Sequence, residues 1–309
     1  MNYNYNKSNK IIYCINCNKK GHYQKKCIYP LISNGLISFK IDNFENNKIN
    51  DLQEHIYNKF NVNRNLLIEN LSKVIDINNI NKDIKFLLVQ RKNSLGYIEY
   101  LRGKYNENII NCDLENENLN NPSINYLIKQ MTEKEIDNIL NKEFDDLWNE
   151  MWNFSGIHNQ YHYNEYTNSK SKFYNVKIKY KKKEFEKSIY NFNERGFPKG
   201  RRNKNENDLD CAIREFNEET NMNEDDLEIF IKCKFLRENL TGTNGIKYIH
   251  NYYLSYLNNY ENKKIDNYEI GDIKLYSLDE ILKIFRPYHI EKIKIVKTMY
   301  SIINDYLTK

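Results

Sequence analysis

The most informative stretch of this chain is residues 200–222, which read GRRNKNENDLDCAIREFNEETNM. From about position 208 to position 219 the apolar residues recur at i, i+3, i+4 and i+7, which places them on one face of a helix. Asn207 and Asp208 are both suitable N-cap residues for that helix. We therefore predict an amphipathic helix, whose apolar face consists of Leu209, Ala212, Ile213 and Phe216.

Three glutamates share a neighbouring face of the predicted helix. Glu215, Glu218 and Glu219 are spaced i, i+3 and i+4, so their charges repel one another unless a cation lies between them. Magnesium or manganese is the natural partner for such hard oxygen ligands. The alternative is an acidic solvated helix face. It is improbable, because six residues would have to fit a metal-binding spacing by chance. These six residues are Gly200, Glu206, Arg214 and the three glutamates.

A stiff turn precedes the helix and reads Gly196-Phe197-Pro198-Lys199-Gly200. Its glycines allow the backbone to come close to a ligand, and Lys199 offers a positive charge to a phosphate group. The turn and the glutamate face together predict a site for a metal ion and a phosphorylated substrate.

A second group of candidate ligands lies near the N-terminus. Three cysteines and a histidine follow the pattern C-x2-C-x4-H-x4-C, with Gly21 directly before the histidine. This is the spacing of a CCHC zinc knuckle, in which three thiolates and one imidazole bind structural Zn²⁺. So short a segment folds only with its metal ion. The predicted ligands are Cys14, Cys17, His22 and Cys27.

The knuckle also has the features of a single-stranded RNA-binding module. Ile15 and Tyr23 occupy the positions of two apolar side chains on which an unpaired base can stack. The alternative is a knuckle that only braces the fold or contacts another protein. Lysines that can reach the phosphates of RNA are Lys19, Lys20, Lys25 and Lys26.

The basic charge of the chain is concentrated at this end. Residues 1–41 contain seven lysines and no acid, which leaves 40 of the 47 basic residues against all 42 acidic ones in the remainder. No stretch approaches the roughly 18 consecutive apolar residues of a membrane span, and the first thirty residues do not resemble a signal peptide. We expect a soluble cytoplasmic protein with reduced cysteines and no membrane partner. The cysteines outside the knuckle are expected to be buried hydrophobes, and they are Cys112, Cys211 and Cys233.

Between the two motifs the pattern changes from strands to helices. Residues 35–41 and 84–90 have the pattern of strands, and residues 97–100 are expected to form a hairpin partner. The Asn-rich segment of about 43–82 has only a weak helical pattern at Leu52, Ile56 and Phe60.

Residues 123 to about 165 predict a helical insertion. Thr132 and Glu135 form a capping box, after which apolar residues repeat at helical spacing for about five turns. Trp148 and Trp152 could stack on a methylated guanine, but an aromatic stripe at this spacing more often packs in a core. The repeat consists of Ile136, Ile139, Leu140, Phe144, Leu147, Trp148, Met151 and Trp152.

The C-terminal third again has strands followed by helices. Residues 227–236, 248–257 and 273–276 are predicted strands, Ser277 and Glu280 form a second capping box, and a last helix is expected from about 291 to 306. This order predicts an α/β/α sandwich around a mixed sheet. The predicted parts are a basic arm and knuckle (1–30), the first part of the catalytic domain (31–118), a mainly helical insertion (119–190) and the remainder of the catalytic domain (191–309).

The spacing of the polar residues between Gly200 and Glu219 resembles the box of the Nudix hydrolases. With Phe197-Pro198-Lys199 before it and the knuckle, it is similar to Nudix mRNA-decapping enzymes, both the eukaryotic catalytic subunit and, more closely, the mimivirus- and asfarvirus-like proteins of large cytoplasmic DNA viruses. The chain departs from the box at Asn221, where glycine is usual, although asparagine also tolerates a left-handed C-cap. Other segments that carry the resemblance are Pro30 to Gly35 and residues 95–105, 144–148 and 286–289.

This resemblance implies that the protein removes the 5′ cap of RNA and releases m7GDP and 5′-monophosphate RNA. Mg²⁺ or Mn²⁺, bound by Glu215, Glu218, Glu219 and the Gly200 carbonyl, would polarise the phosphate and activate water. The implied partner is capped RNA, in the host cytoplasm or a viral factory. The sequence assigns neither cap-binding residues nor an oligomeric state.

The resemblance also implies roles for other residues of the box. Lys199 would hold a phosphate oxygen, and Glu206 and Arg214 would orient the glutamate face. One carboxylate would act as general base, and three glutamates remain candidates for this role. Glu291 is the candidate for an extra acid from outside the box, with His289 second, although Glu291 can also be a plain helix-start carboxylate. The candidate bases are Glu219, Glu215 and Glu291.

Two other functions remain as alternatives. A Nudix enzyme with this box could instead cleave nucleoside polyphosphates or diphosphoinositol polyphosphates, but such small substrates need no RNA-binding arm. A non-enzymatic RNA-binding protein with a degenerate Nudix domain conflicts with the intact set of carboxylates.

Overall fold

The computed structural model describes residues 12–61, 75–76, 79–106, 122–152, 160–179, 188–233, 235–242, 245–260 and 269–309. Within these ranges an eight-stranded mixed sheet forms the centre, with β1 and β7 parallel and the other pairs antiparallel. Its main order is β3-β2-β1-β7-β5, while β4 pairs with β1, β6 with β7 and β8 with β2. The strands are β1 (Leu31–Ile41), β2 (Ile84–Arg91), β3 (Arg195–Gly196), β4 (Lys199–Gly200), β5 (Leu227–Ile229), β6 (Leu236–Thr241), β7 (Lys247–Leu257) and β8 (Ile270–Ser277).

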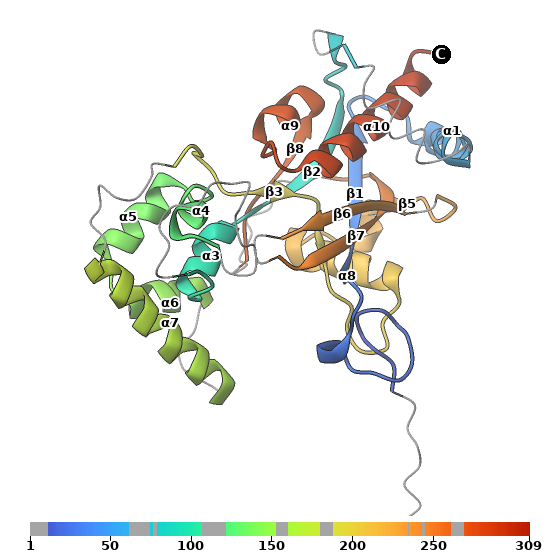
Figure 1. Cartoon of the computed structure of the whole chain (residues 1–309). Coiled ribbons are helices and arrows are strands. Elements are labelled where there is room, and N and C mark those ends of the chain that lie inside the picture. The colour runs from blue at the N-terminus through green and yellow to red at the C-terminus, as the bar shows by residue number, and fades with distance from the viewer. Residues whose placement is uncertain are drawn as a thin grey trace, which may run out of the picture.

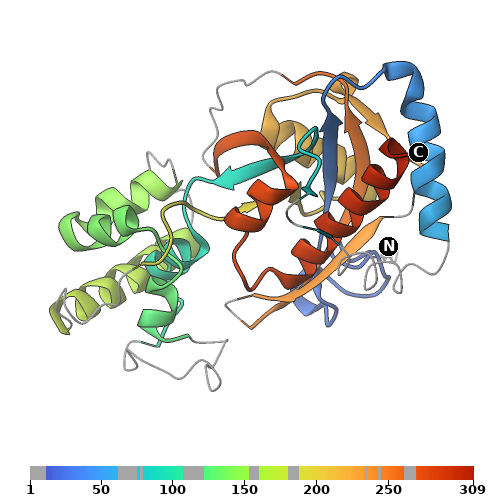
Figure 2. The same cartoon turned by 90° about the horizontal axis from the view of Figure 1, so that it is seen from above.

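Helices cover both faces of this sheet (Figures 1 and 2). On one face α8 (Asp208–Thr220) buries Ala212 and Phe216 against Leu36 of β1 and Leu87 of β2. The other face packs against the remaining helices of the sandwich, whose apolar residues form the largest core cluster. The predicted α/β/α sandwich with a mixed sheet is therefore confirmed. These helices are α1 (Ile49–Asn61), α9 (Leu278–Ile284) and α10 (Ile290–Leu307).

Both ends of α8 follow the sequence prediction. The side chain of Asn207 accepts a hydrogen bond from the Asp210 backbone N–H at 2.9 Å, which satisfies one of the free donors of the first turn. At the other end Asn221 has φ 57° and ψ 23°, the left-handed conformation of a helix C-cap. Asn221 therefore ends the helix in the way that glycine does elsewhere.

A second, entirely helical unit projects from the side of the sheet (Figure 2). Its core is separate from those of the sandwich and includes Tyr100, Phe144, Trp148 and Phe173. Trp148 packs in this core, as an aromatic stripe at helical spacing predicts, and is only 6% exposed. None of the helices in the described part of the chain is long and apolar enough to span a membrane. The helices of the unit are α3 (Leu95–Leu101), α4 (Ile124–Ile128), α5 (Glu133–Asn141), α6 (Phe144–Trp152) and α7 (Gln160–Lys179).

The prediction of a strand at residues 97–100 is wrong, because these residues lie in α3. Ser94 caps that helix by accepting a hydrogen bond from the Tyr97 N–H at 3.1 Å, so a local side-chain contact starts a helix in a segment with strand-like composition. Tyr97 and Tyr100 then pack into the helical unit. We propose that this unit begins at about Leu95 rather than at residue 119.

Two other predicted elements are divided in the structure. The five-turn repeat forms two helices, since Lys142 between them is extended at φ −102° and ψ 162°, while the predicted capping box at Thr132 and Glu135 is present. The predicted strand 227–236 contains a turn at 231–233, which separates β5 from β6. In both cases the apolar residues continue across the break, so the sequence pattern does not reveal it; β5 and β6 both pair with β7, on either side of the turn. Cys112 lies outside the described residues.

A buried ion pair joins the helical unit to the sandwich. Arg286, only 3% exposed, lies 3.5 Å from a carboxylate oxygen of Glu194 and donates a hydrogen bond of 2.7 Å to the Gln130 carbonyl. Its guanidinium also stacks at 3.7 Å over the ring of Tyr190. Because a buried charge is costly unless it is paired, these contacts fix how the two units meet.

Replacing Asn221 tests the left-handed cap. We expect Asn221→Ala to lower the free energy of unfolding by about 1 kcal/mol, since alanine lacks the short polar side chain that lets asparagine adopt this φ, whereas Asn221→Gly should be at least as stable as the original protein. Urea unfolding of the three proteins measures the difference. Equal stability of the alanine variant would contradict the role given to Asn221.

Candidate functional site

The turn before α8 lies unusually close to its neighbours. A Cβ built on Gly35 of β1 would lie 2.1 Å from the Pro198 carbonyl oxygen, so only glycine lets the turn lie against that strand. A Cβ on Gly200 would lie 2.1 to 2.2 Å from the carboxylate atoms of Glu215. The two glycines therefore let the backbone of β4 and the Glu215 carboxylate lie together with no side chain between them.

Two of the three glutamates on α8, Glu215 and Glu219, lie against this turn. Glu219 is 8% exposed and accepts a hydrogen bond of 3.2 Å from the backbone N–H of Lys199. Burial raises the pKa of Glu219 to about 7, with Lys199 acting against the shift and the negative charges of Glu269 and Glu215 adding to it. Burial also raises the pKa of Glu215, where Arg214 acts against it. The site is therefore a buried concentration of negative charge.

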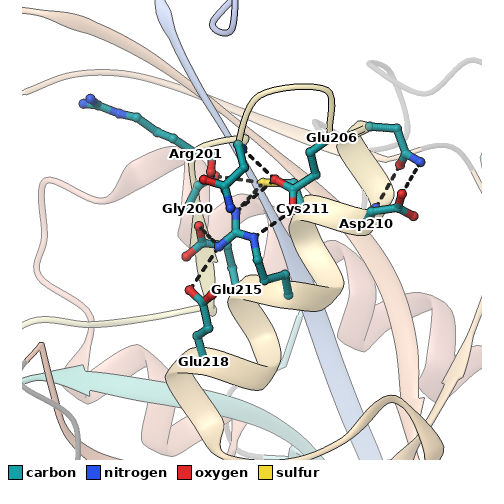
Figure 3. Close-up of polar contacts among 10 residues, drawn as sticks. Gly200, Arg201, Glu206, Asp210, Cys211, Glu215 and Glu218 are labelled. Atoms are coloured by element: carbon teal, nitrogen blue, oxygen red, sulfur yellow. Dashed lines mark hydrogen bonds and ion pairs between the residues drawn. The ribbon is translucent and has the colours of Figure 1, made fainter.

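Arg214 is the main cation among these acids (Figure 3). Its Nε and Nη2 atoms donate to the two oxygens of Glu206 at 2.7 and 3.0 Å, while Nη1 donates to Glu215 at 2.8 Å and to Glu218 at 3.0 Å. Nη2 also donates to the Arg201 carbonyl at 2.9 Å. The Arg214 guanidinium thus links the loop after Gly200 to α8. It also holds the pKa of Glu206 below its usual range.

The donor atoms in this region fit a hard divalent cation. Glu215, Glu218, Glu219 and the Gly200 carbonyl supply only oxygen ligands, which is the chemistry that Mg²⁺ and Mn²⁺ prefer. Glu219 is also a buried carboxylate whose pKa a cation would lower. The three glutamates are not gathered within 4.8 Å of one another, because in the described part of the chain only the knuckle meets that spacing. Arg214 lies between Glu215 and Glu218 instead.

The predicted acid from outside the box lies at the start of α10. Glu291 pairs with Lys294 of its own helix at 2.9 Å, and no contact recorded among the described residues joins it to the box. A different acid, Glu269, lies close enough to Glu219 to raise its pKa, and it pairs with Arg91 at 3.1 Å. Glu269 directly precedes β8 in a stretch rich in Asn, Lys and Glu, where no sequence pattern distinguishes it from its neighbours.

A buried polar cluster lies next to the turn, and the sequence pattern did not predict it. Glu238 accepts hydrogen bonds from His250 at 2.8 Å and Tyr252 at 3.0 Å, and lies 3.9 Å from the ammonium of Lys292. Although burial alone raises the pKa of Glu238, Lys292 and these hydrogen bonds hold it well below its usual range. A Cβ on Gly196 would lie 3.4 Å from the Lys292 nitrogen. The cluster therefore supports the turn from the side of α10.

The four predicted zinc ligands come together in the structure. Their ligand atoms all lie within 4.8 Å of one another, and Cys17 Sγ lies 3.3 Å from Nε2 of His22. The loops that carry them need left-handed residues, which are Asn18 at φ 58° and Gly21 at φ 96°. Three thiolates and an imidazole at this spacing fit Zn²⁺. The ligands are Cys14, Cys17, His22 and Cys27.

The side chains predicted to bind RNA lie on the surface of the knuckle. Ile15 is 37% exposed and Tyr23 is 64% exposed, so both side chains are accessible to a ligand. All four lysines around them are exposed as well. The surface can therefore offer both a stacking platform and positive charge, the latter from Lys19, Lys20, Lys25 and Lys26.

Comparison with known proteins agrees with this geometry. Residues 181–298 match the model of the NUDIX domain. The "Putative mRNA-decapping protein" of Acanthamoeba polyphaga mimivirus is 32% identical over 95% of this chain and 95% of its own length. The mRNA-decapping protein g5R of African swine fever virus is 30% identical over 58% of this chain and 68% of its own.

Among solved structures, a C. elegans Ap4A hydrolase aligns with 90% of this chain and 97% of its own at 12% identity and a TM-score of 0.38, a likeness too distant to carry an argument. The identity to the two viral proteins, over nearly the whole chain in one case, confirms the resemblance drawn from the box and the knuckle. The chain belongs to the Nudix hydrolase family and, within it, to the group that contains these viral mRNA-decapping proteins.

Proposed function

We propose that this protein is a metal-dependent hydrolase that removes the 5′ cap of mRNA and releases m7GDP and 5′-monophosphate RNA. The observation that carries the proposal is the presence, in one chain, of a Nudix box, which runs from β4 into α8, and of a knuckle with exposed apolar and basic side chains directly before β1. In Figure 1 the knuckle lies next to the loop that leads into α8, and Arg202 of that loop donates a hydrogen bond to the Asn16 carbonyl. The names of the two viral relatives support the same activity. We also propose that the protein acts in the host cytoplasm or a viral factory.

We assign the metal site to Glu215, Glu218, Glu219 and the Gly200 carbonyl. Mg²⁺ or Mn²⁺ bound there would polarise a phosphate oxygen and make a bound water more acidic. Neighbouring groups of the protein hold these ligands in position. The Lys199 N–H fixes one oxygen of Glu219, and Arg214 fixes Glu215 from the other side. The Lys199 ammonium then offers charge to a phosphate of the substrate.

The general base is proposed to be a carboxylate of the same cluster. Glu219 is the best placed of the three candidates, because it lies buried beside the turn and the Lys199 N–H fixes one of its oxygens. Glu215 is held by Arg214, and Glu291 is paired with Lys294. For the acid from outside the box we propose Glu269 in place of Glu291, since it acts on Glu219 directly.

The knuckle is proposed to bind the RNA body next to the cap. Tyr23 and Ile15 would stack on an unpaired base, while the exposed lysines contact phosphates. Binding two parts of one substrate raises the effective concentration of the cap at the box. The enzyme should therefore prefer capped RNA to a free cap dinucleotide.

Cap-labelled RNA incubated with the purified protein and Mn²⁺ or Mg²⁺ tests the activity. We expect release of m7GDP, and we expect Glu218→Gln/Glu219→Gln to reduce the rate by roughly 100-fold or more, because it removes two charged metal ligands. The matched control is Glu224→Gln/Glu228→Gln, which makes the same charge change at two exposed acids just after α8. Turnover of nucleoside polyphosphates without cap release would establish the alternative function.

The RNA-binding surface is tested by removing the stacking platform. Ile15→Ala/Tyr23→Ala should raise KM for a capped RNA of 30 or so nucleotides by roughly tenfold, as expected from the loss of base stacking, and leave the kinetics on a cap dinucleotide unchanged. Ile231→Ala, which truncates an exposed isoleucine in the turn between β5 and β6, is the control. An unchanged KM for the long RNA would exclude the knuckle platform from substrate binding.

The buried Glu219 predicts how stability depends on pH and metal. Its pKa is raised by burial to about 7, above the value near 4.5 of an unfolded chain, so the stability that its neutral form gives is complete below pH 4.5 and is lost as pH rises to 7. In chelator at pH 8, Glu219→Gln should therefore be more stable than the original protein by roughly 1 to 3 kcal/mol. Added Mn²⁺ should stabilise only the original protein appreciably. Thermal unfolding at pH 5 and pH 8 measures both effects, and equal pH dependence in the two proteins would contradict the assignment.

A further inference from the structure

The knuckle is attached to the rest of the protein by more than the polypeptide that follows it. Asn16, between the first two zinc ligands, is only 4% exposed. Its Nδ2 atom donates to the Pro30 carbonyl at 2.9 Å and to the Cys27 sulfur at 3.2 Å, while its Oδ1 accepts from the Ile32 N–H at 2.8 Å. One side chain therefore joins a zinc ligand to the start of β1.

The backbone of the same residue contacts the loop of the Nudix box. The Asn16 carbonyl accepts a hydrogen bond of 2.8 Å from Nη2 of Arg202, and Nη1 of Arg202 lies 3.2 Å from Oδ1 of Asp208, the first residue of α8. The Arg202 side chain is 8% exposed. Asp208 in turn accepts a hydrogen bond of 3.2 Å from Asn34 of β1. Arg202 is thus a buried link between the zinc loop, the box loop and the N-terminus of the catalytic helix.

The loop that Arg202 fastens is the one that carries the metal-binding geometry. It starts at Gly200, whose carbonyl is a proposed ligand, and includes the Arg201 carbonyl and Glu206, both of which accept hydrogen bonds from Arg214. Arg214 holds Glu215 and Glu218. A shift of the loop would therefore move the Gly200 carbonyl and the Arg214 guanidinium together.

The zinc site decides whether this link can exist. A knuckle of this size does not fold without its ion, so without zinc the Asn16 carbonyl has no fixed position for Arg202 to bind. The Arg202 guanidinium would then keep only Asp208 as its partner. Residues that orient metal ligands from outside the ligand set commonly change metal affinity tenfold or more when they are altered.

We propose that Arg202 is a positioning residue through which the zinc-loaded knuckle holds the Gly200–Asp208 loop in its metal-binding conformation. The inference rests on the proposed assignment of the metal site, and it gives the knuckle a second role besides RNA binding. An independent RNA-binding arm would affect only substrates long enough to reach it. A knuckle coupled through Arg202 affects the box itself, and therefore also the smallest substrate.

The test compares Arg202→Lys, which keeps the charge but not the two-armed contact, with Arg102→Lys. Arg102 forms an Arg–carboxylate pair of 2.8 Å with Glu165 in the helical unit, far along the chain from the box. Mn²⁺ affinity is measured directly by calorimetric titration, zinc content by metal analysis, and kcat and KM with a cap dinucleotide. We expect Arg202→Lys to retain zinc, to bind Mn²⁺ roughly tenfold more weakly and to lower kcat for the dinucleotide, while Arg102→Lys changes none of these.

A second pair of variants tests the link to zinc. Cys14→Ser/Cys17→Ser, which prevents zinc binding, should weaken Mn²⁺ binding by about the same factor as Arg202→Lys, and combining all three substitutions should weaken it no further. Thermal unfolding confirms that each variant is folded at the assay temperature. Unchanged Mn²⁺ affinity in Arg202→Lys, or effects of zinc loss and Arg202→Lys that simply add, would overturn the proposal. If the original protein binds Mn²⁺ but cleaves no cap, the proposed function fails while the affinity comparison still decides the coupling.

Discussion

The contact between the Gly200 backbone and the Glu215 carboxylate is the constraint on which the site depends. It requires an acidic helix face to lie directly on a tight turn, and this is possible only because Gly35 and Gly200 have no Cβ atoms. The resulting negative charge is costly to bury unless it is balanced. Arg214 supplies part of the balance in the described structure, and a divalent cation would supply the remainder when bound.

Strand β1 connects the features that this contact brings together. Asn16 of the knuckle holds the first residues of β1, Asn34 of β1 reaches the start of α8, and Gly35 lies against the turn at Pro198. The strand then continues through the centre of the sheet, paired in parallel with β7. A single strand thus contacts both the knuckle and the box and fixes their relative positions. If the knuckle binds RNA as proposed, a knuckle fixed in this way would hold the RNA in a defined direction relative to the box, which a module on a flexible linker would not.

The other side of the turn is supported by charges that are buried in pairs. Glu238 with Lys292 lies next to Gly196 of β3, and Glu194 with Arg286 lies where the helical unit meets the sandwich. Buried ion pairs add little net stability compared with apolar packing, but breaking one is strongly destabilising. In this structure each pair joins segments that are distant in the chain, β6 with α10 and the residue before β3 with the loop before α10.

The sequence by itself determined the elements whose signals are local. The apolar period and caps of α8 from Asn207 to Asn221, the capping box at Thr132 and the zinc ligands all depend on residues a few positions apart, so their spacing carries the information. The sandwich class followed from the order of these elements, and the resemblance of the box and knuckle to viral decapping proteins followed from their spacing. Only the tertiary structure decided that residues 97–100 are helical, that Glu269 lies near Glu219, and that Arg202 joins the knuckle to α8. At residues 97–100 the Ser94 cap is local, but the packing of Tyr97 and Tyr100 involves residues as distant as Phe173. Glu269 near α8 and Arg202 near Asn16 depend wholly on contacts between segments tens to hundreds of residues apart, and a pattern within one segment holds no record of them.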